Sequence, residues 1–580
     1  MLLAMRSEVE NAFEQVCSQL DLQMDDFGLE EPPEEIEAIL ASNIAYRMQK
    51  EMEKSPVEIA DLIVELLNSK VFKYISRVYS EGPYINFVPS DRYFSETLEK
   101  AQEDDYGQLE RKGETVIVEH TSANPTGPVH VGRARNPIIG DSISRILAFA
   151  GYHVEKQYYV NDSGKQVATL IWAFEKFDEG ELTELKKNRG DYDIVRYYQR
   201  GNSYLEASSV EERKKSEVEI AHILEQIESG DVEVYKKLVS ITDTILGGMK
   251  DCLNRISVEF DEFVRETMFI RDGSVDEMVE RLKELDGAFE EDGAWKLRMR
   301  NEEKPLVFLR SDGTSLYTTR DLCYHEWKLN KADHIVTILG EDHKFQAGQL
   351  INTLSMLGME TNRIRQVFYS WVNLPEGGMS TRKGTGINLD DLLDESINRA
   401  AHEVTRREKS RIRKVELTEY DVNRIARQVG VGAIRCGIVA TQPGKGITFS
   451  WEDALSFERQ GGPYMQYVHA RCCGILTNQK FDIKDIDSSL LNSKEELDLL
   501  HEISRLPFVI SSAADALEPH RIITYSQRLS EKFNVFYREC PVLKGANPEV
   551  ISARLALVAA TKNAISNSLY LVGIESPDSM

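Results

Sequence analysis

Apolar residues along this chain alternate between helical and strand-like spacing. The spacing predicts helices over 36–50 and 57–67, and Ser55 with the proline that follows is a plausible cap and first turn for the second of them. Residues 82–87 predict a turn followed by a strand. Residues 1–110 are therefore predicted to form a small α+β domain.

The pattern changes at residue 115. A short apolar run at 115–119 predicts a buried strand, a loop rich in Pro, Gly, Ser and Thr occupies 121–132, and helical spacing over 133–150 precedes a second strand at 153–160. This order of strand, loop, helix and strand opens a parallel nucleotide-binding α/β unit. The sequence therefore predicts a Rossmann-type domain.

The remaining pattern predicts how that domain is completed. Further strands are expected at 305–309, 334–339 and 367–372. The expected domains are 1–110, 111–390 with a charged, mainly helical insertion at about 165–300, a helical connection at 391–448, and a helical bundle at 449–580. The predicted fold class is thus multidomain, with α/β and all-α parts.

The charge and the cysteine content of the chain limit the classes of function that it can have. The 580 residues carry a formal net charge of −26, and residues 1–110 hold 24 acidic against 9 basic residues. Contact with nucleic acid is therefore expected only at local basic patches. The 7 cysteines show no Cys-x-x-Cys spacing, and there is no signal-peptide pattern or run of 18 apolar residues. We expect a cytoplasmic chain with no membrane span and no protein-bound zinc or other metal.

Three segments carry candidate chemistry. In 122–133, Gly132 allows a ligand to approach the backbone and His130 suits a phosphate or a ribose, although the segment could merely cap a helix. The hydroxyls and cations of 376–384 suit a polyphosphate leaving group, although a solvated basic turn is the commoner case. Tyr317 and Asp321 could share a helical face and bind a cation, or could simply be a half-buried phenol and a capping carboxylate.

Taken together, these strings resemble arginyl-tRNA synthetase, a class I aminoacyl-tRNA synthetase. His130-Val-Gly-Arg133 is similar to the first class I signature, and Gly378-Met-Ser-Thr-Arg382 to the second. Because several class I enzymes share these signatures, the arginyl resemblance rests on longer strings at 119–124, 312–321, 461–471 and 573–580. The resemblance covers nearly the whole chain and is weakest at about 165–300.

The resemblance implies roles for individual residues. Arginine would be bound by Glu119, Ser122, Asn124, Tyr317, Asp321 and Asp342. ATP would be bound by His130, Gly132, Met379 and Ser380, with Mg²⁺ carried on its phosphates, and the reaction would involve His130, Gly132, Arg133, Ser380, Arg382 and Lys383. Arginine's guanidinium has five donors and a permanent charge, which fits two carboxylates, Glu119 and Asp321.

This sequence departs from the family pattern at positions where the family has histidine or lysine. Arg133 replaces the last His of the first signature, and Gly378 and Thr381 stand where the second signature has its two lysines. Many relatives of this kind have a lysine ahead of the first signature, and here that place is Gly127. Arg133, Arg382 and Lys383 are the candidates for the cation that faces pyrophosphate.

The resemblance also implies binding of arginine tRNA. The C-terminal bundle would read the anticodon through Tyr464, Gln466, Tyr467, Arg471 and Met580, with Tyr537 and His469 as further candidates, although about half of such tyrosines would be core residues. The N-terminal domain would contact the tRNA elbow, and the basic run at 406–414 could touch the tRNA backbone or be a solvated helix face.

The expected function is therefore that of an arginine–tRNA ligase, acting as a monomer on L-arginine, ATP and arginine tRNA. Two alternatives stay open at this point. One is another class I aminoacyl-tRNA synthetase, and Glu119 and Asp321 discriminate here because a synthetase for leucine or cysteine would have no use for a cation-binding pocket. The other is a non-catalytic tRNA-binding relative, suggested by Arg133 and by the altered second signature.

Overall fold

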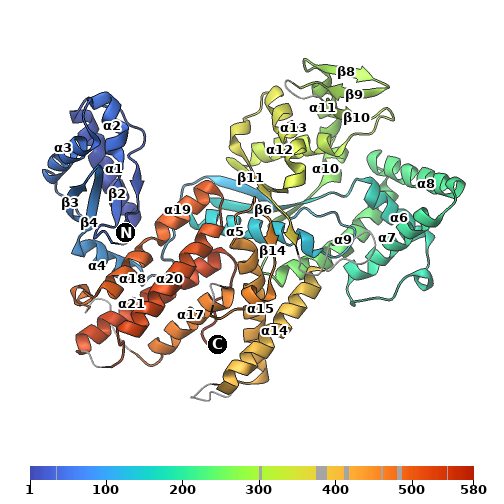
Figure 1. Ribbon diagram of the computed structural model, residues 1–580. Coiled ribbons are helices and arrows are strands. Elements are labelled where there is room, and N and C mark those ends of the chain that lie inside the picture. Colours follow the sequence, from blue (N-terminus) through green and yellow to red (C-terminus); the bar gives the residue numbers. More distant parts are fainter. Residues whose placement is uncertain are drawn as a thin grey trace.

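A five-stranded parallel sheet lies at the centre of the molecule (Figure 1). The computed structural model describes the whole chain except residue 34 and residues 300–303, 374–387, 411–416, 459–460, 480–485 and 545–546. The strand order is β12-β11-β5-β6-β7. The strands are β5 (Thr115–Glu119), β6 (His153–Val160), β7 (Glu262–Arg265), β11 (His334–Gly340) and β12 (Ile364–Tyr369). The order reverses between β5 and β11, and the carboxyl ends of such a pair form the crevice in which this class of sheet binds ligands.

Helix α5 (Arg135–Phe149) follows β5 and is buried on almost every side. A parallel sheet needs helices on its faces, because its strands are apolar on both sides. The other helices that connect or cover these strands are α6 (Lys165–Lys176), α12 (Tyr317–Lys331) and α13 (Lys344–Met356). The strands predicted at 115–119 and 153–160 and the helix over 133–150 are thus confirmed.

The insertion differs in part from the prediction of a mainly helical stretch. Helices α7 (Gly190–Ala207), α8 (Val210–Glu228) and α9 (Val232–Asn254) agree with it. The chain then returns to the central sheet as β7, which pairs in parallel with β6. Beyond it lie α10 (Glu266–Arg271), α11 (Ser274–Lys283) and a small antiparallel sheet of β8 (Ala288–Glu291), β9 (Ala294–Leu297) and β10 (Leu306–Leu309). The strand predicted at 305–309 therefore exists, but it lies outside the parallel sheet.

The N-terminal part is an antiparallel sheet packed with helices. Its sheet order is β1-β2-β4-β3. Its elements are α1 (Leu2–Gln19), β1 (Leu29–Glu30), β2 (Leu40–Ser42), α2 (Ile44–Met52), α3 (Pro56–Asn68), β3 (Ile75–Glu81), β4 (Tyr84–Pro89) and α4 (Asp91–Lys100). Ser55 caps α3 as predicted, since its side chain accepts from the Glu58 N–H. The helix predicted over 36–50 was wrong in its first half, because Leu40–Ser42 pairs with β4 instead.

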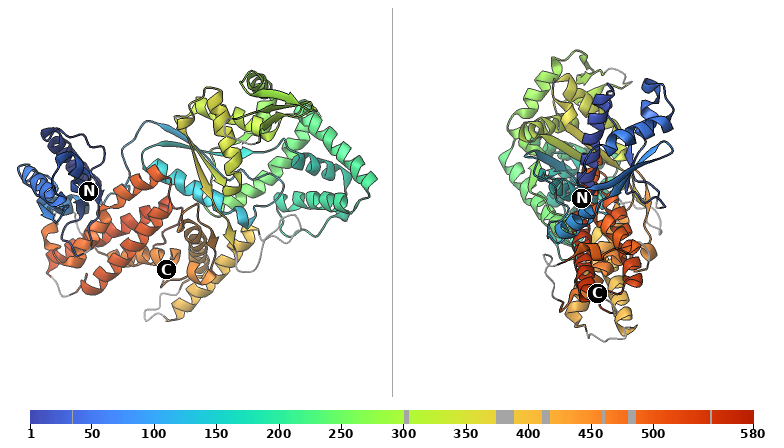
Figure 2. Two further views of the ribbon diagram at one scale, coloured as in Figure 1. Left: turned by 45° about the horizontal axis from the view of Figure 1, so that its top comes forward. Right: turned by 90° about the vertical axis from the view of Figure 1, so that its left-hand side faces the viewer.

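From Leu389 onward the described part of the chain is almost wholly helical, as predicted. Helices α14 (Leu389–Ser410) and α15 (Glu419–Val439) lead to a bundle of α16 (Trp451–Ala454), α17 (Gly462–Leu476), α18 (Lys494–Ser504), α19 (Leu506–Ala516), α20 (His520–Glu539) and α21 (Pro548–Leu571). Two short strands, β13 (Val372–Asn373) and β14 (Ile447–Thr448), pair in parallel beside α15. Figure 2 shows the N-terminal part and the insertion at opposite ends of the molecule. In the described ranges, no helix has the length and apolar character needed to cross a bilayer.

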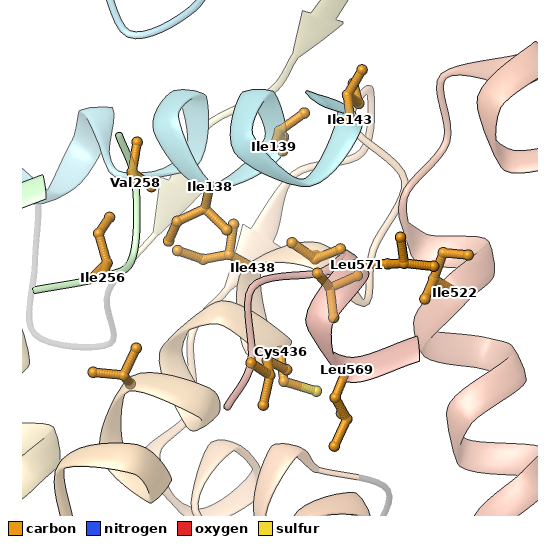
Figure 3. Packing of buried hydrophobic residues seen from close by; sticks show 14 of the residues in the cluster. Ile138, Ile139, Ile143, Ile256, Val258, Cys436, Ile438, Ile522, Leu569 and Leu571 are labelled. Carbon is orange, nitrogen blue, oxygen red and sulfur yellow. The ribbon is translucent and has the colours of Figure 1, made fainter. Parts of the chain in front are cut away.

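The insertion, helix α15 and helix α21 all pack near α5. Figure 3 shows Ile138 of α5 beside Ile438 of α15, with Ile256 and Val258, which follow α9 of the insertion, on one side and Leu571 of α21 on the other. All of these side chains are buried.

One charged group crosses this apolar junction. The guanidinium of Arg435, which is 0% exposed, lies 2.5 Å from a carboxylate oxygen of Asp141 and donates to the carbonyls of Ile256 and Val572. Gly573 has φ +67, and a Cβ there would lie 2.1 Å from the guanidinium carbon, so a side chain at this position would displace Arg435. This one side chain thus joins α5, the insertion, α15 and the C-terminal segment.

Replacing this arginine should destabilise the whole assembly. Arg435→Met leaves Asp141 with Arg145 alone and removes the donors to two buried carbonyls, so we expect a loss of about 3 kcal/mol. The midpoint of urea-induced unfolding measures it. Arg427→Met is the matched control on the same helix, since its pair with Glu575 is half-exposed and should contribute less than about 1 kcal/mol. Equal shifts in the two variants would contradict the role given to Arg435.

Candidate active site

The loop after β5 is strained at the crevice. Thr121 has φ 72° and Ser122 has φ 38°, a left-handed region that non-glycine residues rarely adopt. The Ser122 hydroxyl donates to Glu119 Oε1 (3.2 Å) and accepts from the Tyr159 N–H (3.1 Å). Such a conformation costs about 1–3 kcal/mol per residue and is typical of ligand-binding segments. Two predicted arginine-binding residues, Glu119 and Ser122, are therefore held together by a rigid loop.

Asn136 fixes this loop across the crevice and was missed in the sequence. Its side chain is buried on α5, accepts the Thr121 N–H (2.7 Å) and donates to the Ile338 carbonyl on β11 (3.1 Å). It thereby joins the carboxyl ends of the two strands between which the order reverses. The available signal was a polar amide directly after the first signature, at the start of a helix that is otherwise rich in apolar residues.

Two side chains of α12, Lys328 and His325, connect Glu119 at the end of β5 with Asp321 on α12. Together the four side chains form a row. Lys328 Nζ is 2.7 Å from Glu119 Oε2 and 3.3 Å from His325 Nε2, and His325 Nδ1 is 3.0 Å from Asp321 Oδ1. The structure thus brings the two predicted carboxylates to one site. His325 and Lys328 were missed, although their spacing of four and seven residues from Asp321 puts all three on the same face of a helix.

The surroundings favour a charged carboxylate at Asp321. Burial alone would raise its pKa, but His325, Lys328 and His343 together hold the pKa below its usual value. Tyr159 lies against this group and against Glu119. Its pKa is raised by burial and then by Glu266, Asp321 and Glu119, so the phenol stays protonated. The Tyr159 hydroxyl is buried without a hydrogen-bond partner in the described part of the chain, as expected for a group that faces a ligand.

The other predicted arginine-binding residues lie around this row. Tyr317 begins α12 one turn before Asp321 and is 53% exposed, so its ring is accessible from solvent. Asp342 is exposed in the 3₁₀ turn Glu341–His343, directly after β11. Asn124 donates to Gln166 on α6 at 2.8 Å. Tyr317 and Asp342 are thus accessible from solvent, whereas Asn124 is held by Gln166.

His130 presents a free ring donor. Its Nδ1 accepts the Gly132 N–H (3.1 Å), which places the ring proton on Nε2. Burial, reinforced by Arg133, lowers the pKa of His130, so the ring is neutral near pH 7. Nε2 is buried and has no hydrogen-bond partner among the described residues. A Cβ at Gly132 would come within 3.1 Å of the ring, so glycine keeps this arrangement open.

A cavity of about 320 Å³ opens beside this histidine. It lies between the first signature and helix α7 of the insertion, with His130 and Arg133 on one side and Val195 on the other. Gly127 lines it too, and a Cβ there would lie 2.5 Å from Val195. A lysine at 127 would therefore collide with α7, which explains why this chain has no cation at that place.

The second signature lies outside the described residues, and so do Met379, Ser380, Arg382 and Lys383. The residues on either side of it are described. Before it, the Ser370 carbonyl accepts from Arg135, a fully buried arginine whose pKa burial lowers to about 10. After it, Asn388 forms a bridge with His130, and the Leu389 N–H donates to the Val129 carbonyl (2.8 Å). Both flanks of the second signature are therefore attached to the first.

Four predicted tRNA-binding residues lie together on α17 and α20, where Tyr537 is exposed and Tyr464, Tyr467 and Arg471 are half-buried. The Arg471 guanidinium lies 4.8 Å from the ring centre of Tyr467 and 5.2 Å from that of Tyr537. It also donates to Asn534 (2.7 Å), whose amide donates to the Tyr464 hydroxyl (2.9 Å). Aromatic rings next to an arginine suit the stacking of unpaired bases.

Gln466 and Met580 hold the C-terminal segment instead of facing solvent. Gln466 is 0% exposed and donates to the carbonyls of Gln428 and Glu575. Met580 is 8% exposed and packs in the cluster around α14 and α15. Direct contact with a base would require the C-terminal segment to move.

One group of potential metal ligands lies nearby. His469, Cys473 and Asp578 bring ligand atoms within 4.8 Å of one another. Contacts within the protein account for this grouping, since His469 Nδ1 is 3.0 Å from the Pro577 carbonyl and Cys473 donates to Asp578 at 3.6 Å. The expected absence of zinc stays a prediction.

The parallel sheet, the signature at the start of α5 and the helical bundle define a class I aminoacyl-tRNA synthetase. Residues 96–451 match the family model "tRNA synthetases class I (R), catalytic domain". Residues 4–88 match the "Arginyl tRNA synthetase N terminal domain", and 465–580 the "DALR anticodon binding domain".

Comparisons with individual proteins agree with these models. The chain is 54% identical over 581 residues to the arginine–tRNA ligase of Haloarcula marismortui and 42% identical over 583 residues to that of Methanocella arvoryzae, with 100% of each chain covered. The arginyl-tRNA synthetase structure from Thermus thermophilus has the same fold, with a TM-score of 0.84 at 24% identity over 99% of this chain and 100% of that one. The chain belongs to the arginyl-tRNA synthetase family, the arginine–tRNA ligases. The resemblance inferred from the motifs is confirmed.

Removing the Asn136 side chain should loosen the strained loop. Asn136→Ala leaves the buried Thr121 N–H and Ile338 carbonyl unpaired, which costs about 1–3 kcal/mol. Because the loop carries Glu119, we expect kcat/KM for arginine in ATP–pyrophosphate exchange to fall about tenfold, the equivalent of about 1.4 kcal/mol. Ser144→Ala is the control, since that buried hydroxyl of α5 bonds within its own helix and its loss should leave exchange unchanged. Exchange at the wild-type rate in Asn136→Ala would refute this role.

Proposed function

We propose that this arginine–tRNA ligase activates L-arginine with ATP at the crevice between β5 and β11 and transfers it to arginine tRNA. The observation that carries the proposal is the pair of carboxylates at one site, Glu119 and Asp321, on the strand and helix that border this crevice. A cationic amino acid needs such acceptors, whereas an apolar one would leave them unpaired.

In this proposal the arginine pocket is formed from both sides of the crevice. Glu119, Ser122 and Asn124 bind the amino acid from the loop after β5. Tyr317 and Asp321 bind the guanidinium from the start of α12, and Asp342 closes the pocket. Support comes from the exposure of Tyr317 and from the low pKa of Asp321, which keeps an acceptor charged for five permanent donors.

ATP occupies the side of the site formed by the first signature. The neutral His130 ring donates from Nε2 to a phosphate or ribose oxygen, and the lack of a side chain at Gly132 lets the nucleotide approach the backbone. Met379 and Ser380 complete this side. Mg²⁺ neutralises phosphate charge when it is bound to ATP, and the chain's own part is to position the nucleotide.

The reaction needs no nucleophilic side chain. A carboxylate oxygen of arginine attacks the α-phosphorus of ATP, the bond to the bridging oxygen breaks, and pyrophosphate leaves. The terminal ribose hydroxyl of the tRNA then attacks the activated carbonyl, and AMP leaves. Catalysis therefore rests on orientation and on cations opposite the leaving group. Arg133, Arg382 and Lys383 are proposed for that role, and the attachment of both flanks of the second signature to the first supports it.

We assign tRNA contacts to the C-terminal bundle and to the N-terminal part. Tyr464, Tyr467 and Arg471 read the anticodon loop, with Gln466 and Met580 contributing through the C-terminal segment that they hold. The N-terminal part contacts the tRNA elbow. Its exposed Tyr46 and Tyr84 rings, 5.9 Å apart, support that contact because aromatic rings bind bases without needing positive charge. The domain boundaries at 110, 390 and 448 stay predictions, as do the monomeric state and the cytoplasmic location.

One experiment tests the proposed function directly. Aminoacylation of total tRNA is measured with each of the standard amino acids, together with ATP–pyrophosphate exchange. We expect charging with arginine alone, and exchange that requires both arginine and tRNA. Charging with a different amino acid would indicate another class I specificity. Binding of tRNA without any charging would indicate a non-catalytic relative.

Asp321→Ala should affect arginine far more than ATP. A charged hydrogen bond to the guanidinium contributes about 1.5–3 kcal/mol, so the KM for arginine should rise about 10- to 100-fold while the KM for ATP stays within about twofold. Steady-state exchange kinetics measure both. Glu326→Ala is the control on the same helix, since Glu326 pairs with Arg281 away from this row. An unchanged KM for arginine in Asp321→Ala would remove Asp321 from the pocket.

A further inference from the structure

Lys328 is a fully buried lysine that the proposed reaction does not use. It lies on α12 between Trp327 and Leu329, which belong to a hydrophobic cluster, and its side chain is 0% exposed. Its ammonium is 2.7 Å from Glu119 Oε2 and 4.1 Å from the ring centre of Tyr324. A lysine is almost never fully buried unless its charge is paired, so this placement needs the Glu119 carboxylate.

The protonation of the neighbouring histidine follows from this lysine. An ammonium group can only donate, so the 3.3 Å contact makes His325 Nε2 an acceptor. The ring proton is then on Nδ1, which lies 2.9 Å from the backbone carbonyl of Asp321 and 3.0 Å from its Oδ1. The Lys328 ammonium therefore donates to Glu119 on one side and, on the other side, to the His325 ring that contacts Asp321.

Glu119 has both of its oxygens bound from the protein side. Lys328 donates to Oε2 and the Ser122 hydroxyl donates to Oε1. The orientation of the Glu119 carboxylate is thus fixed by the protein before any substrate binds. The lone pairs that remain unused therefore point in fixed directions. Without the ammonium, Glu119 would be a buried charge without its cationic partner, and its Oε2 would no longer be held in place.

The charges in the row also match the substrate. Glu119, Lys328 and Asp321 sum to one negative charge when His325 is neutral, and arginine with its ammonium, guanidinium and carboxylate carries one positive charge. Two carboxylates without the lysine would exceed the charge of the amino acid. The internal cation therefore makes one carboxylate a neutralised hydrogen-bond acceptor and leaves Asp321 as the one with uncompensated charge.

We infer that Lys328 is a positioning residue for arginine recognition, acting through Glu119 and, by way of His325, through Asp321. The inference rests on the proposed arginine pocket. The competing explanation is that the ion pair only stabilises the core, in which case its loss would change folding but leave the affinity for arginine intact.

Lys328→Met tests the inference, with exchange measured in the presence of tRNA. We expect the KM for arginine to rise at least about tenfold, the equivalent of about 1.4 kcal/mol, and the KM for ATP to stay within about twofold. Lys331→Met is the matched control, since this lysine on the same helix pairs with Glu155 and Glu262 outside the row. Its two KM values should stay at those of the wild type. A wild-type KM for arginine in folded Lys328→Met overturns the inference.

Lys328→Gln guards against a variant that fails to fold. Its amide retains one donor for Glu119 but removes the charge, so the melting temperature should stay near that of the wild type while the KM for arginine rises at least about threefold. An unchanged KM in this variant also overturns the inference. Glu119→Gln separates failure of the inference from failure of the pocket. If Glu119→Gln binds arginine normally, the proposed pocket is wrong; if it binds weakly while both Lys328 variants bind normally, only the role of Lys328 is wrong.

Discussion

The buried pair of Arg435 and Asp141 is the contact on which the arrangement of this molecule depends. Removing two charges from water is costly unless each finds its full set of partners, and the guanidinium finds a carboxylate and two carbonyls that come from separate parts of the chain. All of them must therefore be in place at once. Helix α5, which starts at the first signature, is thus held in a fixed relation to the insertion and to the C-terminal bundle.

That fixed helix explains how the site keeps a strained loop. Asn136, near the start of α5, ties the loop after β5 to β11, and Arg135 beside it holds the backbone that leads toward the second signature. A rigid element with many buried contacts can maintain left-handed backbone at Thr121 and Ser122, which a mobile loop would relax. Helix α5 therefore connects the loop after β5, the segment before the second signature and the C-terminal segment.

Positive and negative charges in the pocket are more nearly balanced than the number of acidic residues in the chain indicates. The chain as a whole is strongly acidic, and two carboxylates border the crevice. Two carboxylates that lie close together without a cation between them repel each other. Lys328 and His325 lie between them and prevent this. In the proposed pocket, selectivity rests on the placement of the charges, since a site that was merely negative would attract any cation.

Local patterns in the sequence were enough to predict the parallel sheet, the capped helix at Ser55, the helical bundle and the family, because each depends on residues close together in the chain. The segment 40–42 and the strand β7 were misjudged, since a strand partner far along the chain outweighed the local helical pattern. Asn136, His325 and Lys328 could not be assigned from motifs for the same reason. A buried amide or lysine acquires its role from the atoms it meets, and those atoms come from strands and helices up to some two hundred residues away, brought together only by folding.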